Sequence, residues 1–304
     1  MRPSSLLALG AAMVLGGCAA SVQLPDTPSL TLEVPFVAPQ NDLCAATSLS
    51  SISLYWEKHA SFTSRLDSGD LARLTLIPER GGTLQSELSA AARQNGLAVY
   101  PLPPSFEALV RELQSGHPVI LLVNRGIGLY PLWHYSVITG YNPSRQAFLA
   151  HFGEHPDEEI GVRTLEKMWE RSGRWGIVPL PPSMIAATAT PRTALKAIWE
   201  MERTADRTAA INAYTAARIR WPDDNDLLFA LAAARAEQGE SEEAQALYRE
   251  LLVRDPSHPY ALNNLAWLLY SKGEKEAART MLQHHLENAG NPSELIRNSY
   301  DEMK

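Results

Sequence analysis

Two residues of this chain have side chains that could act together on an amide bond. Cys44 ends the segment 39–44 (PQNDLC), and His134 follows ninety residues later within the mostly apolar run 132–139. A thiol becomes a strong nucleophile when it loses its proton, and histidine is the side chain that accepts a proton near neutral pH. One cysteine with a distant histidine is therefore typical of a cysteine hydrolase.

The residues around this pair predict how the two side chains are positioned. Apolar residues recur at helical spacing from Ala45 to Trp56, so Cys44 opens an amphipathic helix with Asn41 or Asp42 as its N-cap. Unpaired amide groups at a helix start lower the pKa of a thiol there. His134 lies in a predicted strand, from which it can point into a cleft while its neighbours pack. As an imidazolium it would stabilise the thiolate.

The pattern around these elements predicts a mixed domain over residues 34–182. Two more helices are expected, and a run of apolar strands follows. The expected helices are 84–95 and 105–114, and the expected strands are 118–123, 133–139, 147–152 and 175–179. Helices followed by strands indicate an α+β fold. Prolines and small residues then predict a linker at 183–190.

Residues 191–304 follow a different pattern, which is helical throughout and repeats every 34 residues. Gly239 recurs as Gly273, and alanine recurs at 210, 244 and 278. This pattern resembles the tetratricopeptide repeat, in which small residues let paired helices approach, so we expect an all-α domain of about three units. Residues 223–304 contain 15 acidic and 8 basic residues and thus hold the whole net charge of −7. The sequence contains no basic stripe of the kind that binds nucleic acid. The acidic residues of the repeats could attract a basic partner, but a solvated helix face explains them at least as well.

The first residues predict export. Arg2 precedes a short apolar run, and residues 1–17 are expected to be a signal peptide. The run ends in LGGC, which resembles the lipobox of bacterial lipoproteins and implies lipidation of Cys18, followed by a tether at 18–33. We therefore expect a chain held in the bacterial cell envelope, on the outer membrane facing the periplasm. With Cys18 acylated, Cys44 is the one remaining thiol.

The segments around Cys44 and His134 carry a family resemblance. Residues 34–36 (VPF), Gln40 and Cys44, with 133–142 (WHYSVITGYN), resemble the bacteriocin-processing peptidases, papain-like enzymes that cut leader peptides after a double glycine. More closely, the chain resembles a lipoprotein branch with tetratricopeptide repeats. The resemblance implies a papain-like fold at 34–182, Cys44 as nucleophile, His134 as base and Gln40 as oxyanion donor. The orienting acid of the family is replaced here by His151, with Asn142 or Asp157 as alternatives, and Ala45 stands where the family has glycine.

These observations predict an envelope-anchored cysteine endopeptidase. Its expected partners are a peptide or protein substrate, a protein held by the repeats at 191–304, and the membrane through the lipid. The alternative is a non-catalytic lipoprotein adaptor that binds peptides through a degenerate peptidase fold, which the departures at Ala45 and His151 favour. No cofactor motif is present, and the His151–Asp157 segment lacks the spacing of a metal site, so neither cofactor nor metal is expected.

Overall fold

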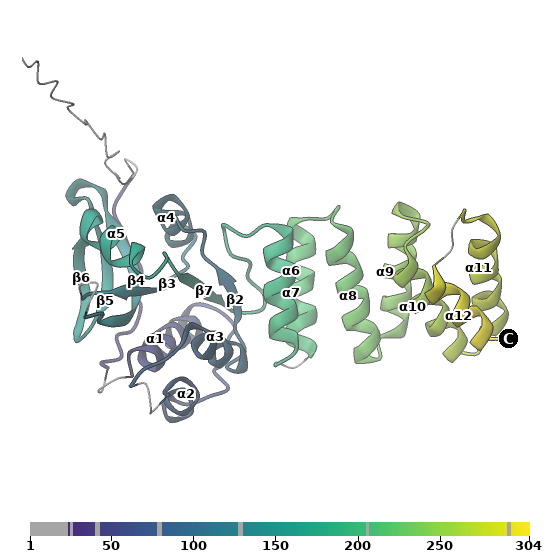
Figure 1. The fold of residues 1–304 in the computed structure, drawn as a ribbon, viewed down its shortest axis with the longest axis horizontal. Helices are drawn as coiled ribbons and strands as arrows, with labels where there is room; N and C mark the ends of the chain where they lie inside the picture. Colours follow the sequence, from purple (N-terminus) through teal and green to yellow (C-terminus); the bar gives the residue numbers. More distant parts are fainter. Residues whose placement is uncertain are drawn as a thin grey trace, which may run out of the picture.

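The computed structural model describes residues 24, 27–39, 43–77, 81–126, 130–204, 207–290 and 293–304. Figure 1 shows an elongated molecule, with a domain built on a sheet at one end and a row of helices that leads away from it to the C-terminus. The expected α+β domain followed by an all-α domain is confirmed.

A seven-stranded antiparallel sheet forms the centre of the N-terminal domain in the described part of the chain. The strand order is β2-β7-β3-β4-β5-β6, and β1 pairs with the far end of β4. The strands are β1 (Leu30–Thr31), β2 (Ala98–Pro101), β3 (Val119–Asn124), β4 (Trp133–Asn142), β5 (Ala147–Phe152), β6 (His155–Gly161) and β7 (Gly176–Leu180). All residues of β3 and β7 are buried. Their apolar composition is that of strands covered on both faces.

Helices cover both faces of this sheet. Figure 1 shows one group of helices on one side of the strands and a second group on the other. The first group is α1 (Cys44–His59), α2 (Ser68–Thr75) and α3 (Gln85–Gln94), and the second is α4 (Phe106–Gln114) and α5 (Val162–Glu170). Helix α1 packs on β4, and its Ser48 hydroxyl donates to the carbonyl oxygen of Tyr135 at 3.4 Å. This contact holds the N-terminal part of α1 beside the start of β4.

The N-terminal segment differs from the predicted tether at 18–33. Leu30 and Thr31 pair with Tyr141 and Gly140 of β4, and Leu24 is 5% exposed. The described residues of this segment therefore pack on the sheet, because apolar side chains at 24 and 30 have a surface to cover. Cys18 and the signal peptide lie outside the described residues.

The segment predicted as a linker, 183–190, lies between β7 and α6 and makes hydrogen bonds to both sides. The buried Glu112 carboxylate of α4 accepts hydrogen bonds from the backbone N–H groups of Ala187 and Thr188 at 3.0 and 2.7 Å, and from the Thr188 hydroxyl at 2.6 Å. Arg220 donates to the carbonyl oxygens of Ala186 and Ala187 at 2.7 and 2.9 Å. The apolar core of the sheet domain continues through Ala186 into the helices that follow. The two domains are thus joined by a packed junction.

The C-terminal helices form antiparallel pairs with the predicted period. They are α6 (Pro191–Glu202), α7 (Arg207–Arg220), α8 (Asn225–Gln238), α9 (Ser241–Arg254), α10 (Pro259–Ser271), α11 (Lys275–Asn288) and α12 (Glu294–Glu302). The alanines at 210, 244 and 278 are fully buried, which lets paired helices approach. Gly239 and Gly273 follow α8 and α10 with φ of 87° and 90°, a left-handed conformation that suits glycine.

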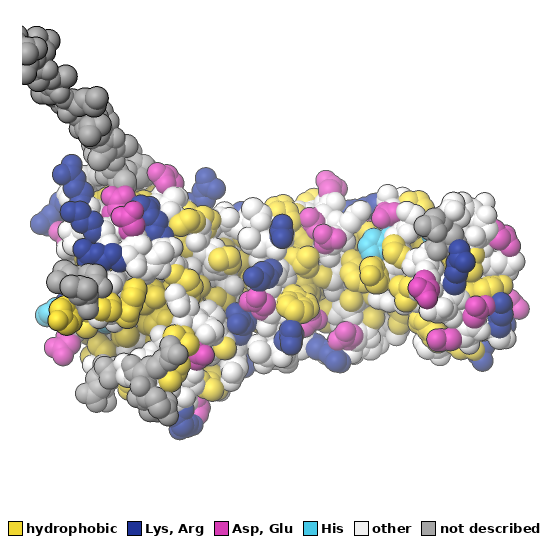
Figure 2. All heavy atoms as spheres, in the orientation of Figure 1, with side chains coloured by type: hydrophobic (Ala, Val, Ile, Leu, Met, Phe, Trp, Pro, Cys, Tyr) yellow, Lys and Arg dark blue, Asp and Glu magenta, His cyan; other side chains and the backbone are white. Residues whose placement is uncertain are grey.

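Side-chain types are distributed differently on the two domains. Figure 2 shows hydrophobic side chains gathered on the visible face of the N-terminal domain, whereas acidic and basic side chains are mixed over the helical row. Within the described residues, no helix has the length and apolar character needed to cross a bilayer.

Candidate active site

Cys44 is the first residue of α1 and is half-buried. Leu43 precedes it without a side-chain cap, and the first turn contains no acidic residue. The amide groups of this turn are oriented toward the helix start, where their partial positive charge favours an anion. Gln40 and the expected caps Asn41 and Asp42 lie outside the described residues, so the oxyanion role of Gln40 stays a prediction.

His134 is the second residue of β4, where it pairs with Val123 of β3. Its ring contacts Phe152 of β5 edge to face, with centroids 5.5 Å apart. The backbone N–H of Gly153 donates a hydrogen bond to Nε2 of His134 at 3.0 Å. A nitrogen that accepts such a bond carries no proton, so the neutral ring holds its proton on Nδ1. Gly153 can present its N–H in this way because it lies in a turn with φ of 64°.

The ring of His134 is uncharged at neutral pH. Burial, and then the positive charge of Arg125, lower the pKa of His134 from an ordinary value near 6.5 to about 4. The Gly153 N–H acts in the same direction, because a protonated Nε2 would face another donor. Burial and Arg125 therefore disfavour the imidazolium that was expected to stabilise the Cys44 thiolate.

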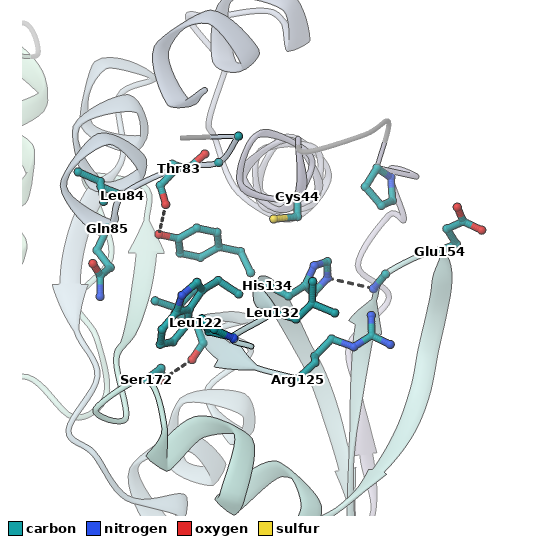
Figure 3. Close-up of a pocket in the computed structure, with 17 residues that line it drawn as sticks. Cys44, Thr83, Leu84, Gln85, Leu122, Arg125, Leu132, His134, Glu154 and Ser172 are labelled. Carbon is teal, nitrogen blue, oxygen red and sulfur yellow. Dashed lines mark hydrogen bonds between the residues drawn. The ribbon is translucent and has the colours of Figure 1, made fainter. Parts of the chain in front are cut away.

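Cys44 and His134 line the same cleft, which has a volume of about 890 Å³. Figure 3 shows Cys44 above the ring of His134, with the dashed bond leading from the ring toward the turn before Glu154. Tyr135 also lines the cleft, and its hydroxyl donates to the carbonyl oxygen of Thr83 at 3.1 Å. Burial raises the pKa of Tyr135 well above its usual range, so this phenol stays protonated. Apolar walls complete the cleft, formed by Leu84, Leu122, Pro131, Leu132 and Trp133.

The residues expected to orient His134 contact other groups. His151 is 6% exposed, donates from Nε2 to the carbonyl oxygen of Val34 at 2.9 Å, and accepts at Nδ1 from the N–H of Asp157 at 3.3 Å. Asp157 thus contacts His151, and its carboxylate accepts from the Thr139 hydroxyl at 2.7 Å. His151 holds the N-terminal segment against β5 and β6. The expectation that His151 or Asp157 orients His134 is therefore wrong.

Asn142 is too far along its strand to orient His134. The two residues are at opposite ends of β4, and eight residues of extended strand span roughly 26 Å. The Asn142 side chain instead accepts from the N–H of Arg145 at 3.3 Å, in the turn that follows β4. The group that contacts Nε2 of His134 is thus the backbone of Gly153.

Sequence reasoning missed Arg125 and Gly153. Arg125 follows β3, and its N–H donates to the carbonyl oxygen of Leu132 at 2.9 Å, which places it next to the start of β4. Asn124 fixes this hairpin by accepting at its side-chain oxygen from the N–H groups of Gly126 and Leu132, both at 2.9 Å. The available signal was the pairing of two adjacent apolar strands, which brings the residue after the first strand close to His134.

Comparisons with known proteins agree with the two-part architecture. Residues 31–176 match the model of the Peptidase_C39 like family, and residues 202–244 and 236–297 match models of the tetratricopeptide repeat. A search of the curated proteins gives no significant match.

Solved structures also contain chains that are similar to this one. A Bacillus anthracis protein described as C39-like peptidase is 18% identical, with a TM-score of 0.40, over 51% of this chain and 98% of that chain. The Sgt2 TPR domain from Aspergillus fumigatus is 20% identical, with a TM-score of 0.34, over 37% of this chain and 76% of that one. The type III secretion translocator chaperone SycD from Yersinia enterocolitica is 21% identical, with a TM-score of 0.34, over 38% of this chain and 91% of that one. By the family models, residues 31–176 are thus similar to the Peptidase_C39 like family and residues 202–297 to tetratricopeptide repeats.

Proposed function

We propose that this protein is a cysteine endopeptidase in which Cys44 is the nucleophile and His134 the general base. The observation that carries the proposal is that these two side chains, from a helix start and a strand ninety residues later, line one open cleft. The position of Cys44 at the start of α1 adds electrostatic support for a thiolate. The Peptidase_C39-like family match supports the same activity.

The geometry defines how the proton would move. Because Nε2 accepts from Gly153, Nδ1 is the ring nitrogen left for the thiol, and in the resting state it already holds a proton. The ring must release Gly153 and carry its proton on Nε2 before Nδ1 can accept the thiol proton. The thiolate then attacks the amide carbon, and His134 returns the proton to the leaving nitrogen. Water hydrolyses the acyl-enzyme, with His134 accepting its proton and returning it to the sulfur.

A peptide library tests the proposal without a known substrate. The full-length chain is incubated with peptides from a bacterial proteome, and new termini are identified by mass spectrometry. Cleavage by the parent and by His155→Ala, a control on exposed β6, but not by Cys44→Ser or His134→Ala, is the expected result. New termini that appear equally with Cys44→Ser would disprove the assignment.

A second candidate function is a non-catalytic adaptor that binds peptides in the same cleft. The observation that favours it is the Gly153 bond to Nε2 of His134, which holds the ring in the tautomer that cannot accept a proton from Cys44. For an adaptor, peptides that protect Cys44 from alkylation would be recovered uncut. Their affinity would be the same for the Cys44→Ser variant.

We further propose that the substrate or a protein partner binds the repeats and that a lipid on Cys18 holds the chain in the cell envelope. A pocket of about 670 Å³ between α6 and α8, lined by Trp199, Phe229 and Ala233, supports the first part. The second part is supported by the lipobox-like sequence before Cys18. Labelling with radioactive palmitate in bacteria, with Cys18→Ser as control, tests the anchor, and equal labelling of both proteins would exclude it.

A further inference from the structure

A cation lies beside the base of the candidate site. The guanidinium of Arg125 lies 4.6 Å from the ring centroid of Phe152, which itself contacts the ring of His134. A Cβ atom added to Gly153 would lie 3.5 Å from Nη1 of Arg125, so the guanidinium is next to the turn that donates to His134. Figure 3 shows Arg125 and His134 on the same side of the cleft.

Within the described part of the chain, this guanidinium has no carboxylate partner within 4.0 Å. Other arginines of the sheet domain do have one; for example, Arg145 pairs with Glu159 at 3.0 Å and Arg174 pairs with Glu166 at 3.2 Å. Glu154 lines the cleft as well, but Figure 3 shows its carboxylate directed away from Arg125. Arg125 is exposed and lines the cleft.

The positive charge of Arg125 opposes the proton transfer that the proposed reaction requires. Arg125 disfavours a second positive charge on His134, and so it hinders transfer of the thiol proton to the ring. An anion bound to Arg125 would offset that repulsion. An anionic group of a ligand would thus be attracted to the cleft and would also make His134 a better base.

We propose that Arg125 forms an anion-binding subsite that takes a carboxylate of the peptide ligand beside Cys44 and His134. The carboxylate comes from an acidic side chain or from a peptide C-terminus, and both suit the planar fork of a guanidinium. As a statement about peptidase specificity the inference rests on the proposed function. The anion subsite itself can be tested without catalysis.

The first test compares two alkylating agents that differ in charge. Iodoacetate and iodoacetamide react with Cys44 in the full-length chain, and mass spectrometry of the Cys44 peptide separates it from Cys18. The ratio of the iodoacetate rate to the iodoacetamide rate should fall about 5-fold in Arg125→Gln. A fall of this size corresponds to the upper end of the range measured for exposed ion pairs. The ratio should be retained in Arg125→Lys and in Arg145→Gln, the control at the far end of β4. Any change in His134 basicity affects both reagents alike and cancels in the ratio. An unchanged ratio in Arg125→Gln, with an unchanged melting temperature, overturns the subsite.

The second test distinguishes the two sources of the carboxylate. N-acetylglutamate α-amide carries a side-chain acid, N-acetylglycine a terminal acid, and N-acetylglutamine amide no charge. The acid that matches the ligand should slow iodoacetamide labelling of Cys44, and Arg125→Gln should abolish the protection. Equal protection by the neutral amide, or protection that persists in Arg125→Gln, overturns the inference. A subsite that passes both tests in a protein that cuts no peptide would support the adaptor and exclude the peptidase.

Discussion

Replacement of His134 by alanine tests the electrostatic state of the candidate site. The pKa of His134 is lowered to about 4, a shift that disfavours the charged ring by about 3 kcal/mol. At pH 7 roughly one ring in a thousand is then protonated. The parent therefore lacks an imidazolium to stabilise the thiolate, and His134→Ala should change the rate of Cys44 alkylation by iodoacetamide less than about 3-fold between pH 6 and 8. Peptide cleavage, which needs the ring as a base, should be lost in the same variant.

The assay follows alkylation of the Cys44 peptide by mass spectrometry from pH 4 to 9. A thiol without a charged partner is about 0.3% thiolate at pH 6, whereas a thiolate–imidazolium pair is already largely ionised there. His155→Ala controls for loss of an exposed imidazole from the neighbouring β6. A reactive plateau from pH 5 to 7 in the parent that disappears in His134→Ala would refute the neutral ring and the role given to Gly153.

Three further substitutions test the framework around the site. Glu112→Gln should lower the free energy of unfolding by about 2 to 3 kcal/mol at pH 7, because the junction loses charge-assisted hydrogen bonds. Burial raises the pKa of Glu112, but hydrogen bonds from His117 and Thr188 outweigh this effect and keep the pKa below 4.5. The difference in unfolding free energy between the two proteins should therefore shrink as the pH falls below that value. A difference that stays constant with pH in urea denaturation would contradict this. Gly140→Ala should displace β1, because the new methyl group collides with the carbonyl oxygen of Leu30; hydrogen exchange of residues 30–34 should accelerate, and unchanged protection would count against the pairing. Asn95→Ala should cost about 2 to 3 kcal/mol, since buried Asn95 accepts from the N–H groups of Arg65 and Leu66 at 2.9 Å and donates to Ser53 at 2.8 Å; a loss below 1 kcal/mol in urea would show that water replaces these bonds.

Local sequence patterns predicted the elements that are apolar along their length. The helix from Cys44, the helices near 84–95 and 105–114, and the strands that became β3, β4, β5 and β7 all agree with the structure. Strand β6 was missed because its first five residues are exposed and include Pro156, so the local pattern does not indicate the strand that its pairing with β5 forms. Helix α5 carried a usable signal, since its buried residues fall on one helical face.

The site was predicted less completely than the fold. Residue type and order brought Cys44 and His134 to attention, and both line the cleft. The neighbours that determine the state of His134 are a backbone N–H at Gly153 and an exposed arginine at 125, and neither has a distinctive sequence. Strand register and turn conformation place them, and both depend on long-range pairing. His151 illustrates the converse, because its position in the family pattern suggested a role that its contact with Val34 contradicts.

The packed junction between the sheet and the repeats has a consequence for ligand selection. Because Glu112 and Arg220 hold residues 186–188, the cleft and the pocket between α6 and α8 stay at one separation. A peptide that binds both must span that separation with its own chain. One of matching length is held at the cleft at an effective concentration in the ~mM range, whereas a shorter one gains nothing from the second contact. The spacing between two recognised segments, as much as their composition, would then decide which chains are held.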